Sequence, residues 1–289
     1  MCGQTAVKGM HMATLHQFTY GLVTPVLAYG LSFLGSLLGL IATGRARDSA
    51  PGGARARWLV LAAWAIGGTG IWVMHFMAML GFSVNGSAIR YDIQTTIASW
   101  LIAVIVVGVG LFVVGYGRPS VTKVLVGGAL TGSGVAAMHY SGMEGMRMDA
   151  TVGYSGPMVA ASVVIAVVAS TVALWFTLVV RKAAMVVPAA ALMGVAVCGM
   201  HYTGMYAMRV HLHDSAVQLQ GVDPMMFLVP IMIFVILVAV ALAYAMLAAP
   251  SKRDRDFQQD LHDRISDRPA TKAIPATSAF IPLRERRQR

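Results

Sequence analysis

The sequence predicts an all-helical membrane protein with seven spanning helices, and three observations lead to this fold class. Hydrophobic residues make up 57% of the chain and charged residues only 12%, with a mean hydropathy of +0.69. That composition leaves too little polar surface to cover a water-soluble globule. Apolar stretches recur at or above the roughly 20 residues that a helix needs to cross the hydrocarbon of a bilayer. The basic residues are spread very unevenly between those stretches.

Seven apolar stretches reach the spanning length. The first is too long for the core of a cleaved signal peptide and follows a polar or mixed segment, so we interpret it as a retained helix. The predicted spans are residues 22–43, 58–82, 93–115, 121–143, 157–180, 184–207 and 226–249.

The distribution of Lys and Arg predicts the orientation, because these residues accumulate on the cytoplasmic side of membrane proteins. Of the 22 Lys and Arg, 18 fall on one side of the predicted spans. We therefore expect a multi-pass protein of the plasma membrane with its N-terminus outside and its C-terminus inside. The net charge of +10 then reflects topology and attraction to membrane lipids, and no nucleic-acid partner is expected.

Three segments follow from this topology. Residues 1–20 form a short extracytoplasmic segment, residues 21–249 form the seven-span domain, and residues 250–289 form a basic cytoplasmic tail. The tail has mixed charge, several prolines and few large apolar residues, so we expect it to be largely disordered, with a short amphipathic turn around Phe257–Ile265 as the alternative.

A histidine-centred pattern occurs three times at a spacing of 64 and then 62 residues, at His75, His139 and His201. Each histidine follows a methionine and precedes an aromatic residue. A second methionine lies at i+4 in every copy and therefore shares the histidine's helix face; these are Met79, Met143 and Met205. The copies occupy spans 2, 4 and 6, which run in one direction. The sequence thus predicts a threefold helical-hairpin repeat with three histidines at one depth in the outer leaflet.

Residue chemistry at this level favours a metal site. An ionisable side chain inside a span usually faces the bundle interior or a functional site. Thioether sulfur combined with imidazole selects copper, particularly Cu(I), over zinc or magnesium. Runs of small residues upstream, at 67–70, 127–134 and 194–199, would let the helices approach closely. Packing histidines that only hydrogen-bond between helices are the simpler alternative.

The third copy reads Met200-His201-Tyr202-Thr203, the second MHYS (Met138–Ser141) and the first MHF (Met74–Phe76). With these motifs the sequence resembles the MHYT family of bacterial seven-helix membrane sensors over about residues 16–249. The resemblance implies a copper ion near the outer face that senses oxygen, carbon monoxide or nitric oxide. The implied ligands are His75, Met79, His139, Met143, His201 and Met205, with Met74, Met138 and Met200 as further candidates.

Two other residues could extend this set. Cys198 lies three residues before His201 and could add a soft ligand, although a buried structural cysteine is an equal alternative. His16 precedes the first span on the outer side and could cap the site.

Members of the resembled family are often fused to cyclic-di-nucleotide or kinase output domains. The resemblance implies a diatomic gas as the sensed ligand. It also implies a signalling output, which we expect a separate protein to supply. The sequence contains no phosphate-binding glycine loop, nucleophile elbow or metalloprotease motif, so we predict that the chain is not an enzyme.

Other functions of seven-span membrane proteins require different residues. A retinal protein would need a lysine in the last span, and residues 226–249 contain none. A haem-b protein stays open, because two histidines on facing helices permit bis-imidazole ligation. A copper-handling transport protein also stays open, but the inner halves of the spans lack the His, Cys and Met ladder that a transport path would use.

Overall fold

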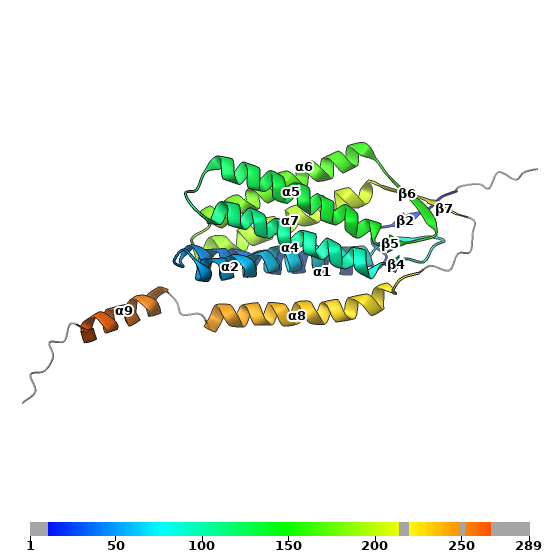
Figure 1. Cartoon of the computed structure of the whole chain (residues 1–289). Coiled ribbons are helices and arrows are strands. Elements are labelled where there is room, and N and C mark those ends of the chain that lie inside the picture. The colour runs from blue at the N-terminus through cyan, green and yellow to red at the C-terminus, as the bar shows by residue number, and fades with distance from the viewer. Residues whose placement is uncertain (1–10, 214–219, 249–251, 267–289) are drawn as a thin grey trace, which may run out of the picture. The chain divides into compact units, whose positions relative to one another are not determined.

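Seven long apolar helices form the membrane part of the protein (Figure 1). The structure, a computed structural model, describes residues 11–213, 220–248 and 252–266. All seven stretches expected to span the membrane are helical, with ends that differ from the expectation by at most five residues. The helices are α1 (Val23–Arg47), α2 (Gly53–Ala63), η1 (Trp64–Val73), α3 (Met74–Leu80), α4 (Ile93–Gly115), α5 (Val121–Glu144), α6 (Gly156–Val179), α7 (Ala183–Tyr206) and α8 (Pro224–Ala248).

The first six spans close into a ring. In order around it, α1 packs on the second span, the second span on α4, α4 on α5, α5 on α6, α6 on α7, and α7 again on α1. The last span, α8, lies outside this ring against α1 and η1. Spans 2, 4 and 6, which carry the three histidines, are therefore alternate members of the ring.

The second span is one continuous path of α2, η1 and α3, and its middle section η1 is a π-helix. The backbone of this span approaches the backbones of neighbouring helices closely where its residues are glycines. A Cβ added to Gly67 would lie 2.7 Å from the carbonyl oxygen of Ala103 on α4. The indole of Trp72 donates a hydrogen bond of 2.9 Å to Ser99 Oγ, which fixes η1 against α4. This is the close approach of small-residue stretches that the sequence predicted for residues 67–70.

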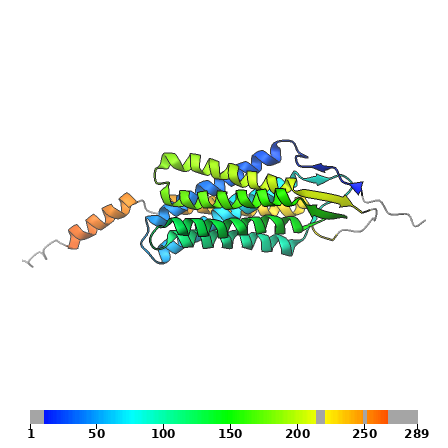
Figure 2. The same cartoon turned by 90° about the horizontal axis from the view of Figure 1, so that it is seen from above.

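Three small antiparallel sheets join the loops at one end of the ring, which we call the sheet end (Figures 1 and 2). Strand β7 (Met208–Leu212) pairs with β6 (Ala150–Tyr154), and Ala150 faces Leu212 in this register. The sheet end also contains β1 (His11–Met12) on β7, β2 (Leu15–His16) on β3 (Ser83–Val84), and β4 (Arg90–Tyr91) on β5 (Met146–Arg147). The expectation of a purely helical fold overlooked these strands, because each is only two to five residues long.

Strand pairing ties together loops that are far apart in the sequence. The β4–β5 ladder joins the loop after α3 to the loop after α5, and the β6–β7 ladder joins the latter to the loop after α7. The ends of the three histidine-bearing helices are therefore held at one level.

Beyond the membrane part, the structure describes a separate helix, α9 (Lys252–Ser266). It contains the stretch for which the sequence offered an amphipathic turn as the alternative to disorder. Phe257, Leu261 and Ile265 recur every four residues on one face, and Arg264 pairs with Asp260 one turn earlier at 2.9 Å. Such i, i+4 pairs stabilise short helices. The rest of the tail and residues 1–10 lie outside the described residues.

Candidate metal centre

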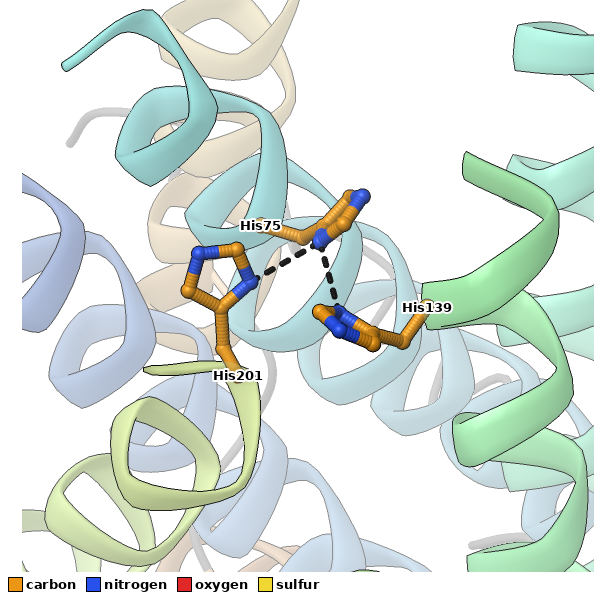
Figure 3. A group of neighbouring side chains, drawn as sticks. All are labelled: His75, His139 and His201. Atoms are coloured by element: carbon orange, nitrogen blue, oxygen red, sulfur yellow. Dashed lines mark hydrogen bonds between the residues drawn. The ribbon is translucent and has the colours of Figure 1, made fainter. Parts of the chain in front are cut away.

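His75 on α3, His139 on α5 and His201 on α7 meet in the middle of the ring (Figure 3). Each lies five residues before the last residue of its helix, as the shared depth in the sequence predicted. At most 1% of each residue is exposed. The ring centroids are 4.9, 5.0 and 5.1 Å apart, so the imidazoles form a nearly equilateral triangle.

The Nδ1 atoms are the innermost atoms of this triangle. His75 Nδ1 lies 3.0 Å from His201 Nδ1 and 3.1 Å from His139 Nδ1. Two nitrogens bound to one ion at about 2 Å, in tetrahedral or trigonal geometry, lie roughly 3.3–3.5 Å apart. A small outward movement of the rings would therefore seat an ion between them, and the three ligand atoms already lie within 4.8 Å of one another.

The protein does not satisfy the nitrogens of these rings. A neutral imidazole has one N–H donor and one lone pair. His75 Nδ1 lies within hydrogen-bond distance of two other nitrogens. It has either one N–H or one lone pair, so it can form a good hydrogen bond with only one of them. In the described part of the chain, the three Nε2 atoms are buried without any hydrogen-bond partner. When the proton of each neutral ring is on Nε2, the three Nδ1 lone pairs meet at the centre of the triangle, and this arrangement fits three nitrogen donors that share a metal ion.

An aromatic ring packs edge-on against each imidazole. Phe76, Tyr140 and Tyr202, the residues that directly follow the histidines, have centroids 4.9, 5.0 and 5.0 Å from the imidazole centroids. The interplanar angles are 88°, 78° and 77°. Tyr140 is anchored further by a 2.7 Å hydrogen bond between its hydroxyl and Ser162 Oγ on α6. The aromatic position of the motif thus fixes the plane of each histidine ring.

Two glycines that are not among the residues predicted from the sequence provide the space for the imidazoles. A Cβ on Gly142 of α5 would lie 2.5 Å from His75 Nε2, and one on Gly204 of α7 would overlap His139 Nε2. Each glycine stands three residues after the histidine of its own copy, where the first copy has the small Ala78. That recurrence at i+3 is the signal that could have revealed them. The imidazoles of His75 and His139 therefore each pack on the next histidine-bearing helix.

The structure buries all six candidate methionines. Met79, Met143 and Met205, at i+4 from the histidines, have exposed fractions of 1%, 3% and 0%. Met74, Met138 and Met200, which precede the histidines, are equally buried. The helices that carry them are those that bring the histidines together. Sulfur ligation remains a prediction.

Cys198 and His16 do not join the histidine cluster. Over the described residues, the group of His, Cys, Asp and Glu close enough to hold one ion consists of His75, His139 and His201. Cys198 is a free, partly buried cysteine on α7. His16 lies exposed on strand β2 at the sheet end.

Similarity to known proteins supports a signalling role. The chain is 39% identical over 155 residues to the bifunctional diguanylate cyclase/cyclic di-GMP phosphodiesterase MucR of Pseudomonas aeruginosa, which covers 52% of this chain and 22% of that protein. It is 38% identical over 157 residues to the cyclic di-GMP phosphodiesterase NbdA of the same organism, with 52% and 20% covered. The signaling protein YkoW of Bacillus subtilis is 31% identical over 160 residues, with 51% and 20% covered. The chain thus spans about a fifth of the length of these relatives. No solved structure matches it.

The sequence model of the MHYT family, described as a bacterial signalling protein N-terminal repeat, matches three times, at residues 68–127, 132–190 and 194–256. Each match contains one of the histidines of the central triangle, and together they cover more than half of the chain. With seven apolar helices long enough to cross a bilayer, the chain is a multi-pass membrane protein that belongs to the MHYT family of bacterial signalling proteins.

Proposed function

We propose that the chain is a sensor of the bacterial plasma membrane, in which His75, His139 and His201 hold a copper ion that responds to a diatomic gas or to redox state. The observation that supports this proposal most strongly is the convergence of three buried imidazoles, with His75 Nδ1 only 3.0 and 3.1 Å from the Nδ1 atoms of His201 and His139. When bound, copper supplies a redox-active centre with affinity for small gases. Met79, Met143 and Met205 are the proposed sulfur ligands, because thioethers favour Cu(I) over zinc.

A cavity next to the site supports a small apolar ligand. It has a volume of about 50 Å³ and reaches Met200, the residue before His201. Its walls are mostly aliphatic side chains from α1, η1, α4, α5, α6 and α7, among them Ile66, Leu111 and Val135. This exceeds the roughly 10–15 Å³ that a cavity needs to hold one water molecule, so a diatomic molecule fits inside it.

The arrangement of ligands suggests how binding could be transmitted. The three histidines come from alternate helices of the ring, so a ligand that changes their spacing acts on three helices at once. A ligand shifts the conformation only if it binds one helix arrangement better than another. We propose that the shift is read by a signalling output, and the names of the relatives point to the turnover of cyclic di-GMP.

Among the alternatives, the geometry weighs against haem. Bis-imidazole ligation places two nitrogens on opposite faces of a macrocycle, at roughly twice the 2 Å metal–nitrogen distance. Here the Nδ1 atoms approach to 3.0 and 3.1 Å, and the rings of α3, α5 and α7 pack directly on one another. A copper-handling transport protein would contain the same histidine site. A measurement of copper flux across vesicle membranes distinguishes a transporter from a sensor.

The decisive experiment is metal analysis of the purified chain and of histidine variants. Replacing any one of the three histidines by Ala should remove most of the bound copper, and double replacements should be little worse, because ligands of one site are strongly coupled. Independent packing histidines would instead leave the metal content unchanged and lower the melting temperature additively. A haem absorption band with no copper would overturn the proposal in favour of haem.

A further inference from the structure

A second cavity lies at the opposite end of the ring from the sheets, which we call the basic end. Its volume is about 890 Å³. It is lined by the last residues of α1, the first turn of α2, the end of α4, the start of α5 and the end of α6. Among the lining residues are three arginines, Arg47, Arg55 and Arg181, and one carboxylate, Asp48. The cavity is therefore positively charged.

Two of these arginines are held in fixed positions. Arg47 donates hydrogen bonds to the carbonyl oxygens of Thr177 and Val180 at the end of α6. Arg55 Nη2 donates to the carbonyl oxygen of Ser49 at 3.0 Å, and its guanidinium carbon lies 5.9 Å from the centre of the Tyr116 ring. Positively charged side chains that merely mark the inner side of a membrane protein do not need such anchoring.

The cavity also leaves hydrogen-bond donors unused. Arg55 Nε is buried and lacks a partner among the described residues. The 24-residue helix α5 starts in the wall of the cavity at Ser120 and Val121, and the Ser120 hydroxyl does not cap its first turn. Unpaired amides and the positive end of the helix dipole attract an anion there.

The remaining wall of the cavity is apolar and faces outward. Val121, Leu125, Trp175 and Val179 line it, and between 46% and 76% of each residue is exposed. These residues belong to membrane-spanning helices, so this surface meets lipid tails. A cationic cavity bordered by lipid-facing apolar side chains suits an amphiphile better than a free ion.

We propose that this cavity binds the phosphate headgroup of an anionic phospholipid, whose acyl chains lie along Leu125 and Trp175. Arg55 and Arg181 contact the phosphate, and Arg47 holds α6 against α1 beside it. Basic cavities between spanning helices are a recognised setting for anionic headgroups. This site is separate from the histidine triangle and does not depend on a bound metal.

The chain offers a matched control for this proposal. Arg57 lies on the same helix as Arg55, and Lys182 directly follows Arg181, but neither lines the cavity. The double variants Arg55→Gln/Arg181→Gln and Arg57→Gln/Lys182→Gln therefore remove the same charge from the same two segments. Only the first removes it from the cavity.

The test is retention of phosphatidylglycerol by the full chain in detergent, measured by native mass spectrometry, with phosphatidylcholine as the zwitterionic comparison. We expect the wild type and the Arg57/Lys182 variant to retain phosphatidylglycerol selectively, and the Arg55/Arg181 variant to bind it at least tenfold more weakly. Equal losses in both double variants would show diffuse charge attraction and overturn the site. Equal retention of the two lipids by the wild type would also overturn it.

Two further arms make the result unambiguous. Displacement of the lipid by millimolar inorganic phosphate would assign the cavity to a free anion and overturn the choice of a phospholipid. Arg181→Gln alone changes an exposed side chain and should fold normally, so it should weaken lipid retention severalfold even if the double variant does not fold. Unchanged retention in the folded single variant would contradict the role of Arg181.

Discussion

At the scale of single residues, the site depends on the small residues that make room for the imidazoles as much as on the imidazoles themselves. The imidazoles of His75 and His139 occupy space that exists only because Gly142 and Gly204 lack side chains. Phe76 and Tyr140 pack edge-on against the same two imidazoles. Ligand orientation in metal sites depends on such supporting contacts as well as on the ligands themselves.

Gly204→Ala tests this packing. The added methyl group would overlap the His139 ring, and overpacking of this kind costs about 1–3 kcal/mol. We expect a lower melting temperature by circular dichroism and a reduced copper content. The control is Gly199→Ala on the same helix, where a Cβ would meet nothing within 4 Å and helix propensity alone should stabilise by up to about 1 kcal/mol. Equal behaviour of the two variants would contradict the packing role.

The sulfur ligands are tested by Met143→Leu/Met205→Leu. Leucine nearly conserves the volume of these buried side chains, so folding should be little affected. Cu(I) affinity, measured by competition with a chromogenic chelator, should nevertheless fall, because leucine offers no donor atom. Met193→Leu, on the same helix as Met205 but outside the motif, serves as control. Unaltered Cu(I) affinity in the double variant would rule out Met143 and Met205 as ligands.

At the scale of elements, helix ends and loops determine where the histidines lie. The π-helix η1 carries the chain into α3, and the sheets β4–β5 and β6–β7 hold the far ends of the helices level. Helix α4 begins at the same end with a charged cap. Asp92 accepts hydrogen bonds from the Thr95 amide at 2.9 Å and the Thr95 hydroxyl at 2.8 Å, and lies 3.4 Å from Arg147.

This cap predicts a pH dependence of stability. The hydrogen bonds from the Thr95 amide and hydroxyl, with Arg147 nearby, lower the pKa of Asp92 below its ordinary value. A carboxyl whose pKa is lower in the folded state stabilises the fold above its unfolded pKa, and this contribution is lost as the pH falls through the folded pKa. Asp92→Asn keeps a capping oxygen but no charge, so its melting temperature should change less than that of the wild type between pH 7 and pH 3. Parallel pH curves would exclude the carboxylate as a contributor.

At the scale of the whole molecule, the two ends of the ring differ in character. The sheet end carries strands and lies nearer to the histidine triangle, whereas the basic end collects the arginines of the charged cavity. The orientation in the membrane and the helical-hairpin repeat remain predictions from the sequence.

A reporter fused after Arg289 tests the orientation. The predicted cytoplasmic side holds 18 of the 22 Lys and Arg. After Arg289, a reporter that works only in the cytoplasm, such as a fluorescent protein, should therefore be active, and an alkaline phosphatase fusion should be inactive. The reverse pattern is expected for a fusion in the loop after α7, at the sheet end. Alkaline phosphatase activity after Arg289 would place the histidine site near the opposite face of the membrane.

Much of this architecture follows from the sequence alone, because hydropathy and helical periodicity are local properties. The spans could be bounded within a few residues, and the i+4 methionines and the common depth of the three histidines could be deduced without coordinates. A copper site could be proposed from residue chemistry and family resemblance. The spacing of Phe257, Leu261 and Ile265 indicated an amphipathic turn as an alternative to disorder, and helix α9 contains these residues.

Only the tertiary structure decided which atoms meet. The 3.0 and 3.1 Å approaches of the Nδ1 atoms, the glycine surfaces that receive the rings, and the two cavities depend on how six helices close into a ring. The two-residue strands at the sheet end depend on it as well, since they form only when distant loops are brought together. Single positions such as Gly204 or Arg55 look ordinary in the chain, because their roles arise from neighbours contributed by other helices.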